Sequence, residues 1–413
     1  MKRSFASLAL PTLLPALLAG CAASPVSRTP AHADTALSEA EAEALYQERF
    51  ARYMRREPGA GLAGYDTLAP VEGTADWTPF PNGGGVAPDA LAAARAYAAQ
   101  ANSSAFLVWQ GGHMVSEDYF GDTTATSPVV SKSLAKPLAT IAVGRAMAAG
   151  HIASLDQPMS DFLTEWQDTL KAAITIRQVL GMRSGLLPQG SSTDPDSVLN
   201  RSYLHPFHDR VLIEDYPLVD TPGSRYEYSN ANGDLVALLI ERATGIPYEE
   251  WVGREVLAKI GARGGQIWMD HPGGTPHSGC CILLPAESYL RLAVLLAQDG
   301  TWEGARLLPE GFVTAMRRPS AQNPHAGLGV YVGAPYVEWR GPANPELTYG
   351  RSYHSEPYAA DDLFLFDGNS NQVVYVVPSR QLVVLRTGDS PPKEPVWDNT
   401  VLPNLILRGL SAN

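Results

Sequence analysis

Ser133 and Lys136 stand three residues apart in SKSLAKPLATIAVG, where polar residues give way to apolar and small ones. Residues three apart on a helix share one face, so the hydroxyl and the amine would be neighbours if a helix begins here. The free backbone N–H groups and positive dipole end of a helix start favour an anion at such a serine. A lysine shielded from water can accept the hydroxyl proton, and the pair therefore predicts an activated serine nucleophile.

The spacing alone also fits an ordinary helix start with a solvated lysine. Ser390 and Lys393 have the same spacing, but the prolines between and after them oppose a continuing helix. Apolar and small residues follow Ser133 instead, in a pattern that lets a helix bury itself. Lys132 fits no motif, and we interpret it as a surface charge.

A second candidate stretch, Tyr228-Ser229-Asn230, precedes an apolar run that predicts a helix ending at Gly245. A tyrosine beside a buried lysine can relay a proton to a leaving group. An asparagine amide can hydrogen-bond a substrate carbonyl or the lysine. By itself the triplet also fits a loop with helix-capping residues, so it is the combination with Ser133 and Lys136 that favours catalysis.

The sequence predicts strands near both ends of the chain and helices in the middle, and these elements would have to position the candidate residues. SAFLVWQ and HMVSEDYF flank Gly111-Gly112, a turn typical of a hairpin. DLFLF, QVVYVV and LVVLRT predict further strands near the C-terminus, whereas residues 134 to about 316 are mostly helical in pattern. We therefore predict an α+β fold, in which one sheet is assembled from distant segments beside an inserted helical lobe.

Charge and motif content restrict the class of partner. The 413-residue chain has a formal charge of −12 and no Lys/Arg run, which argues against nucleic acid and favours neutral, zwitterionic or cationic substrates. No His-Glu-x-x-His or calcium-loop spacing occurs, so no metal or cofactor is expected. The absence of G-x-S-x-G argues against an α/β-hydrolase.

The chain has three cysteines, Cys21, Cys280 and Cys281, too few for a disulfide framework. Neighbouring Cα atoms lie about 3.8 Å apart, below the usual range for a disulfide. We therefore predict that Cys280 and Cys281 are two buried thiols.

The N-terminus has the pattern of an export signal, with Lys2 and Arg3 before a short apolar run and small residues. Its end, Leu-Ala-Gly-Cys21, resembles the lipobox of bacterial lipoproteins, in which the cysteine is lipidated. This implies a signal peptide at 1–20 and an acyl anchor as the one membrane contact. Ala22 resembles the outer-membrane sorting choice, so we expect a lipoprotein of the cell envelope, in the outer membrane and facing the periplasm. The alternative is a plain secretory signal, with Cys21 incidental.

Five further stretches follow one another between residues 105 and 388: FLVWQGGHMVSEDYF, SLAKPLATIAVGRAMAAGHIASLDQPMSDFL, ITIRQVLGMRSGL, PGSRYEYSNANGDLVALLIERATG and NSNQVVYVVPSRQLVVLRTG. Together they resemble serine hydrolases related to class C β-lactamases, a family with penicillin-binding peptidases, esterases and 6-aminohexanoate-dimer hydrolases. The resemblance implies a β-lactamase/transpeptidase-like fold, an antiparallel sheet flanked by helices. It also implies an acyl-enzyme, in which Ser133 attacks a carbonyl, Lys136 takes its proton, Tyr228 shares the proton traffic and Asn230 orients substrate or lysine.

The resemblance further implies a third motif on a strand, where relatives that recognise a carboxylate carry K-T-G or H-x-G. The nearest equivalent is Phe366-Asp367-Gly368-Asn369, in which the N–H of Asn369 would join that of Ser133 in binding an oxyanion. Phe366 replaces the lysine, and Asp367 would repel a carboxylate. The alternatives for this strand are H-S-E at 354–356 and H-S-G at 277–279.

These features predict the following division of the chain: signal peptide 1–20, flexible tether 21–36, N-terminal helical arm and crossing 37–104, and hydrolase domain 105–413. The sheet lobe would comprise 105–132 and about 320–413, and the helical lobe about 133–319. We predict a serine hydrolase of small-molecule esters or amides, not primarily a β-lactamase. The alternatives are a D-alanyl-D-alanine peptidase or β-lactamase, and a non-catalytic envelope lipoprotein that binds peptide or cell-wall ligands.

Overall fold

The computed structural model describes residues 37–55, 65–341, 343–348 and 350–410. The predicted signal peptide, the lipidation site Cys21 and the tether lie outside these residues. None of the helices that the model describes is long and apolar enough to cross a membrane.

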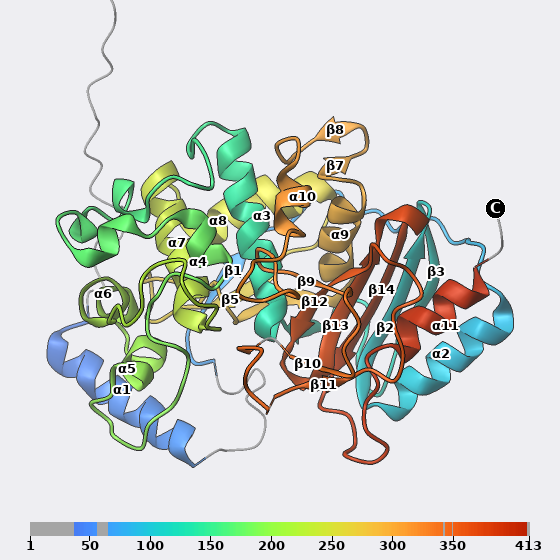
Figure 1. The fold of residues 1–413 in the computed structure, drawn as a ribbon, viewed down its shortest axis with the longest axis horizontal. Helices are drawn as coiled ribbons and strands as arrows, with labels where there is room; N and C mark the ends of the chain where they lie inside the picture. The colour runs from blue at the N-terminus through green and yellow to red at the C-terminus, as the bar shows by residue number, and fades with distance from the viewer. Residues whose placement is uncertain (1–36, 56–64, 342, 349, 411–413) are drawn as a thin grey trace, which may run out of the picture. The chain divides into compact units, whose positions relative to one another are not determined.

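The largest sheet has six strands, and every neighbouring pair in it is antiparallel (Figure 1). Strands from the two ends of the chain meet in it, because β2 pairs with β14. The turn predicted at Gly111-Gly112 connects the first hairpin, and both glycines have positive φ. In spatial order the strands are β3 (His113–Tyr119), β2 (Ser103–Gln110), β14 (Leu382–Gly388), β13 (Gln372–Val377), β12 (Phe364–Gly368) and β9 (Tyr331–Val332).

Both faces of this sheet are buried, which explains why β13 is QVVYVV without polar alternation. Val374 and Val376 share one core with α9 (Ala286–Ala297). The alternate residues Val373 and Tyr375 share the other with α2 (Pro88–Gln100) and α11 (Val401–Gly409), which lie together on that face in Figure 1. The predicted α+β class, an antiparallel sheet flanked by helices, is confirmed.

The middle of the chain forms the helical part of the fold. α3 (Ala135–Ala148) is buried along most of its length and packs against α7 (Asn230–Thr244). α7 ends at Gly245, whose φ of 72° is the left-handed cap expected of a glycine there. α8 (Tyr248–Val252) follows, and Gly261, with φ 60°, ends the helical segment after it.

A second, four-stranded sheet differs from the mostly helical pattern expected for this region. Its strands have three or four residues, too few to show alternation in the sequence. β4 ends one residue before Ser131 and β6 begins directly after Cys281, so their pairing brings these two segments together. The strand order is β1 (Leu68–Val71), β5 (Gly265–Trp268), β6 (Ile282–Pro285) and β4 (Pro128–Val130).

The N-terminal arm begins with α1 (Glu39–Met54), and a capping box of Ser38 and Glu41 opens it. α1 packs on α5 (Val198–Leu204). Its Arg49 is buried, donates to Asp66 at 2.8 Å and also donates to the carbonyl of Leu204 at 3.1 Å. Residues 37–413 cluster as one compact unit, so the arm is part of the same body as the sheet.

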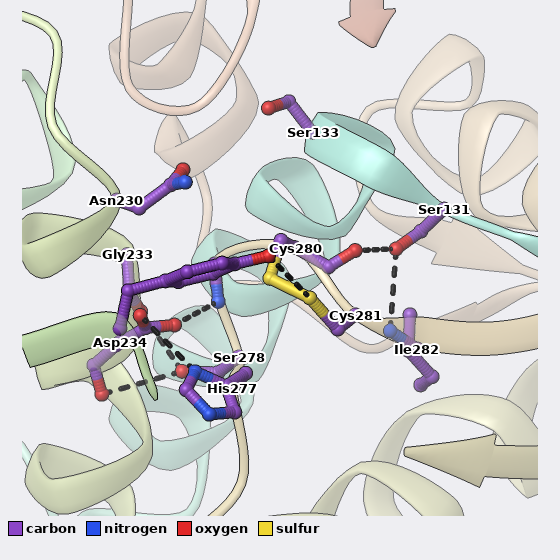
Figure 2. Close-up of a disulfide and its surroundings, with 12 residues drawn as sticks. Ser131, Ser133, Asn230, Gly233, Asp234, His277, Ser278, Cys280, Cys281 and Ile282 are labelled. Carbon is purple, nitrogen blue, oxygen red and sulfur yellow. Dashed lines mark hydrogen bonds and ion pairs between the residues drawn. A yellow bond between two sulfur atoms is a disulfide. The ribbon is translucent and has the colours of Figure 1, made fainter. Parts of the chain in front are cut away.

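The prediction of two thiols at Cys280 and Cys281 is wrong, because the structure joins them in a disulfide (Figure 2). Both residues are buried, as predicted. They lie in a turn, in which their two N–H groups donate to the carbonyl of His277 at 3.4 and 3.1 Å. The prediction rested on the spacing of neighbouring Cα atoms, which does not describe how a turn directs two adjacent side chains.

The disulfide predicts the mass of one peptide. Trypsin should release residues 264–291, and without reductant this peptide should be two hydrogens lighter than its reduced form and should resist alkylation. The measurement is mass spectrometry of chain denatured in iodoacetamide, with and without prior reduction. Alkylation of both cysteines before reduction would contradict the bond.

Candidate active site

Ser133 lies in a 3-10 turn, Lys132–Leu134, that runs directly into α3. The helix start predicted here is therefore present, with a tighter first turn. Lys136 is the second residue of α3, and Pro137 follows in the first helical turn, where a missing N–H removes no helical hydrogen bond. The side chains of the serine and the lysine meet, with Nζ of Lys136 3.1 Å from Oγ of Ser133.

Lys136 is buried, and three oxygen atoms surround its amine. Nζ lies 2.8 Å from Oδ1 of Asn230 and 2.8 Å from the carbonyl oxygen of Gly279, in addition to the serine. A neutral amine has two N–H donors and one lone pair, whereas an ammonium has three donors. The amide and peptide oxygens can only accept, so they take two N–H groups and leave the third direction for Ser133. Lys136 can therefore receive the serine proton without changing its other two hydrogen bonds.

Tyr228 contacts the same serine oxygen from another segment. Its hydroxyl hydrogen-bonds to Oγ of Ser133, and its ring centre lies 4.7 Å from Nζ of Lys136. Gln189, which is not among the residues predicted from sequence, holds the loop in place. Its N–H donates to the carbonyl of Tyr228 and its Oε1 accepts the N–H of Asn230, both at 3.1 Å.

Gly279, the third partner of Lys136, lies in the turn before the disulfide. The turn packs so closely on α7 that a Cβ on Gly233 would lie 2.6 Å from Cα of Gly279, so only glycine fits. Asp234 accepts the N–H of Gly279 at 2.8 Å, and Ser278 donates to the carbonyl of Gly233 at 2.8 Å (Figure 2). The triplet H-S-G, an alternative for the third motif, thus lies at the site as part of a turn.

Ser131 connects this turn to the segment that carries Ser133. It is fully buried, its hydroxyl donates to the carbonyl of Cys280, and it accepts the N–H of Ile282 at 3.3 Å (Figure 2). The pairing of β4 with β6 continues these hydrogen bonds. The two segments on which Ser133 and Gly279 are carried are therefore fixed to each other by backbone and side-chain contacts.

The stretch predicted to be the third motif, 366–369, lies at the end of β12 beside the turn that carries Ser133. A Cβ on Gly368 would lie 3.2 Å from the carbonyl oxygen of Ser131 and 3.2 Å from the side chain of Leu134, so the strand approaches the serine turn closely. Gly368 and Asn369 line the same cavity as Ser133, Tyr228 and Asn230. The alternative at 354–356 does not line this cavity.

The cavity has a volume of about 970 Å³, and cationic side chains outnumber acidic ones along its wall. Lys132 is half-buried in this wall, which corrects its interpretation as a surface charge, and burial lowers the pKa of its amine. The N-terminal helix α1 contributes Arg49 and Arg52, whose charges are shared with Asp66. The charged residues of the wall are Arg49, Arg52, Lys132, Arg351, Asp234 and Asp367.

Asp367 brings an acidic group to the end of β12. Its neighbour Phe366 points into the core and is fully buried, so no cation occupies that position. Burial raises the pKa of Asp367 to about 6, although the charge of Arg340 opposes part of this rise. The carboxyl group is therefore mostly ionised at pH 7 and becomes neutral in mildly acidic solution.

Known proteins resemble this chain in sequence and in fold. The family model described as Beta-lactamase matches residues 89–397. A 6-aminohexanoate-dimer hydrolase from Paenarthrobacter ureafaciens is 24% identical over 231 residues, which cover 52% of this chain and 57% of that protein. The match therefore spans little more than half the length of this relative.

Two solved structures share the fold. One, from Bacillus anthracis and provisionally assigned as a 6-aminohexanoate-dimer hydrolase, has a TM-score of 0.65 and 17% identity, covering 86% of this chain and 93% of its own. The other is EstCE1, described as a hydrolase with promiscuous acyltransferase activity, with a TM-score of 0.56 and 15% identity. It covers 77% of this chain and 97% of its own.

The raised pKa of Asp367 predicts a pH-dependent stability. Protonation is easier in the folded chain than in the unfolded one, so the stabilising effect is complete below about pH 4 and is lost as pH rises through 6. Asp367→Asn should thus be more stable than wild type at pH 8, by on the order of 2 kcal/mol, and nearly equal to it at pH 4. Urea unfolding at both values measures this. The exposed Asp361→Asn serves as control, and an equal effect of Asp367→Asn at both values would contradict the assignment.

Proposed function

The chain belongs to the Beta-lactamase family, and from this membership we propose that it is a serine hydrolase that cleaves an ester or amide through an acyl-enzyme at Ser133. Two of the similar proteins are described as hydrolases, the 6-aminohexanoate-dimer hydrolase and EstCE1. The observation that carries the proposal is the environment of Lys136. Two carbonyl-type acceptors hold its amine so that its remaining direction faces the serine hydroxyl at 3.1 Å.

In the proposed reaction, Oγ of Ser133 attacks the substrate carbonyl while Lys136 takes the hydroxyl proton. The backbone N–H groups of Ser133 and Asn369 would stabilise the negative oxygen of the tetrahedral intermediate. Tyr228 would then pass a proton to the departing alcohol or amine as its bond to the carbonyl carbon breaks, and the proton that Lys136 took from Ser133 would return to Tyr228. Water would hydrolyse the ester to Ser133 by the same proton transfers in reverse and release the acid.

For the substrate, we propose a small linear amide or ester that is neutral or zwitterionic. Phe366 and Asp367 offer no cation for a β-lactam carboxylate at the end of β12, which argues against a β-lactamase. Lys132 and Arg351 give the same cavity a cationic part, so a substrate with one charge of each sign would be complemented. One relative is named for a dimer of 6-aminohexanoate, an amino acid, which supports a substrate of this class.

We also propose that the protein is exported and anchored through Cys21 in the cell envelope. The export pattern at 1–20 supports export. The Cys280–Cys281 disulfide is a second, independent support, because disulfides persist mainly in oxidising compartments such as the periplasm.

Labelling with a fluorophosphonate tests the nucleophile. The full chain should gain one adduct, seen by intact mass, and should hydrolyse a p-nitrophenyl ester. Ser133→Ala should lose the adduct and at least about 10³-fold of the turnover. Ser390→Ala is a matched control, because Ser390 has the same spacing to a lysine but is exposed and lies outside the cavity.

Two outcomes would overturn the proposal. Labelling that persists in Ser133→Ala would assign the nucleophile to another serine. A folded wild-type chain with neither adduct nor turnover would favour the alternative of a lipoprotein that binds cell-wall ligands without cleaving them.

The charge of Asp367 makes a separate prediction about substrate choice. At pH 7.5, Asp367→Asn should accelerate acylation by benzylpenicillin, which carries a carboxylate, several-fold, because one repulsive charge is removed. The rate with neutral p-nitrophenyl acetate should change little and serves as the internal control. Stopped-flow or quenched acylation rates measure both, and equal changes for the two substrates would show that the charge of Asp367 does not act on the ligand.

A further inference from the structure

Three buried side chains that the proposed reaction does not use converge behind the Gly279 turn. They come from distant parts of the chain: His208 from α6 (His208–Arg210), Asp234 from α7 and His277 from the turn. One nitrogen or oxygen atom of each lies within 4.8 Å of the corresponding atom of the other two. Both histidines are fully buried, and Asp234 is 1% exposed.

The two imidazoles have no hydrogen-bond partner on either ring nitrogen, within the part of the chain that the structure describes. Burying a polar group without a partner costs about 1–3 kcal/mol, and native structures contain few such groups. Here four unpartnered nitrogen atoms lie in one place. A ligand that accepts a lone pair from one nitrogen of each imidazole would account for two of the four.

The rings are also held in fixed orientations. His277 stacks on Trp268 with a centre distance of 3.9 Å and an interplanar angle of 14°, and the ring centres of His208 and His277 are 4.2 Å apart. Nδ1 of His277 lies 3.6 Å from Oδ2 of Asp234, while Oδ1 of the same carboxylate is engaged by the N–H of Gly279. One carboxylate oxygen therefore faces the imidazoles.

We propose that His208, Asp234 and His277 bind one divalent transition-metal ion, with zinc as the best match. Zinc binds imidazole nitrogen and carboxylate oxygen at about 2.0–2.2 Å, which places tetrahedral donors about 3.4 Å apart. The His277–Asp234 pair, at 3.6 Å, is already close to this spacing. Two imidazoles with one carboxylate select zinc and its neighbours over magnesium or calcium, which prefer oxygen ligands.

Asp270 is a further buried carboxylate, but it lies outside the group whose ligand atoms are within 4.8 Å of one another, so it would have to move to become a fourth ligand. Oδ2 of Asp270 is buried without a hydrogen-bond partner, whereas Oδ1 accepts the N–H groups of His271 and Thr275, both at 2.7 Å. A water molecule could equally complete the tetrahedron. The metal would be structural, since the cluster reaches the nucleophile only through other groups.

The ion would position the catalytic lysine through two hydrogen bonds. Asp234 holds the N–H of Gly279 at 2.8 Å, and the carbonyl of Gly279 accepts from Lys136 at 2.8 Å. Loss of the ion would let Asp234 and the turn shift, and with them one of the two acceptors that direct Lys136 at Ser133. We therefore class the three ligands as positioning residues.

Metal content of the untagged full chain tests the proposal. The chain is expressed with added zinc, purified without chelators, freed of loose metal by gel filtration and measured by inductively coupled plasma mass spectrometry. We expect about one zinc per chain, and less than about a tenth in His208→Gln and in His277→Gln. His325→Gln is the matched control, since this histidine is also buried with an unpartnered ring nitrogen but lies outside the cluster, and it should keep the metal.

Cobalt gives a readout that does not depend on activity. Metal-free chain loaded with Co²⁺ should show the strong visible absorption of tetrahedral cobalt, and His208→Cys should keep the metal and add a thiolate charge-transfer band. Wild type with less than a tenth of an equivalent and no such spectrum would overturn the proposal, leaving buried water as the partner of the imidazoles. Unchanged metal in His208→Gln would overturn it too. If the glutamine variants do not fold, wild type and His208→Cys decide the question.

Discussion

The buried amine of Lys136 is the constraint on which the rest of the site depends. A lysine removed from water has to be given hydrogen-bond acceptors, and it finds them in three segments: the turn before α3, the start of α7 and the turn before β6. The last two segments lie 94 and 143 residues from the lysine in the sequence. The rest of the fold holds these three segments together around the amine.

Two devices do this holding. The small sheet pairs β4 with β6, and Ser131 adds hydrogen bonds to the backbone on either side of Cys281. Gly233 on α7 and Gly279 in the turn before β6 form the second contact, because the two backbones lie too close to leave room for a side chain at either position. The large sheet contributes the end of β12, and its two buried faces make it a rigid support for Gly368 and Asn369.

Much of the fold could be predicted from the sequence, because long helices and strands have clear periodic patterns and turns have characteristic residues. The helix after Ser133, the capping box at Ser38, the hairpin at Gly111-Gly112 and the C-terminal strands follow from periodicity and turn residues. Tyr228 and Asn230 could be predicted as site residues because they stand in a recognisable stretch before a helix. The catalytic roles of these residues stay a prediction.

The contributions of Gly279, Asp234, Lys132 and the disulfide could not be predicted, and the reason is physical. Each depends on a turn or on the contact of distant segments, which neither period nor spacing encodes. Lys132 has φ 47°, a left-handed conformation that is uncommon for a residue with a side chain and that places it beside the cavity. The cluster of His208, Asp234 and His277 spans 70 residues, from 208 to 277, without any local motif.

The N-terminal helix has a consequence for how the domain should be delimited. The family match begins at residue 89, yet Arg49, Arg52 and Tyr53 of α1 line the same cavity as Ser133. Residues that precede the matched region thus form one wall of the cavity. A chain trimmed to the matched region would keep Ser133 and open that wall, so the size and charge of the cavity depend partly on a segment that the family match leaves out.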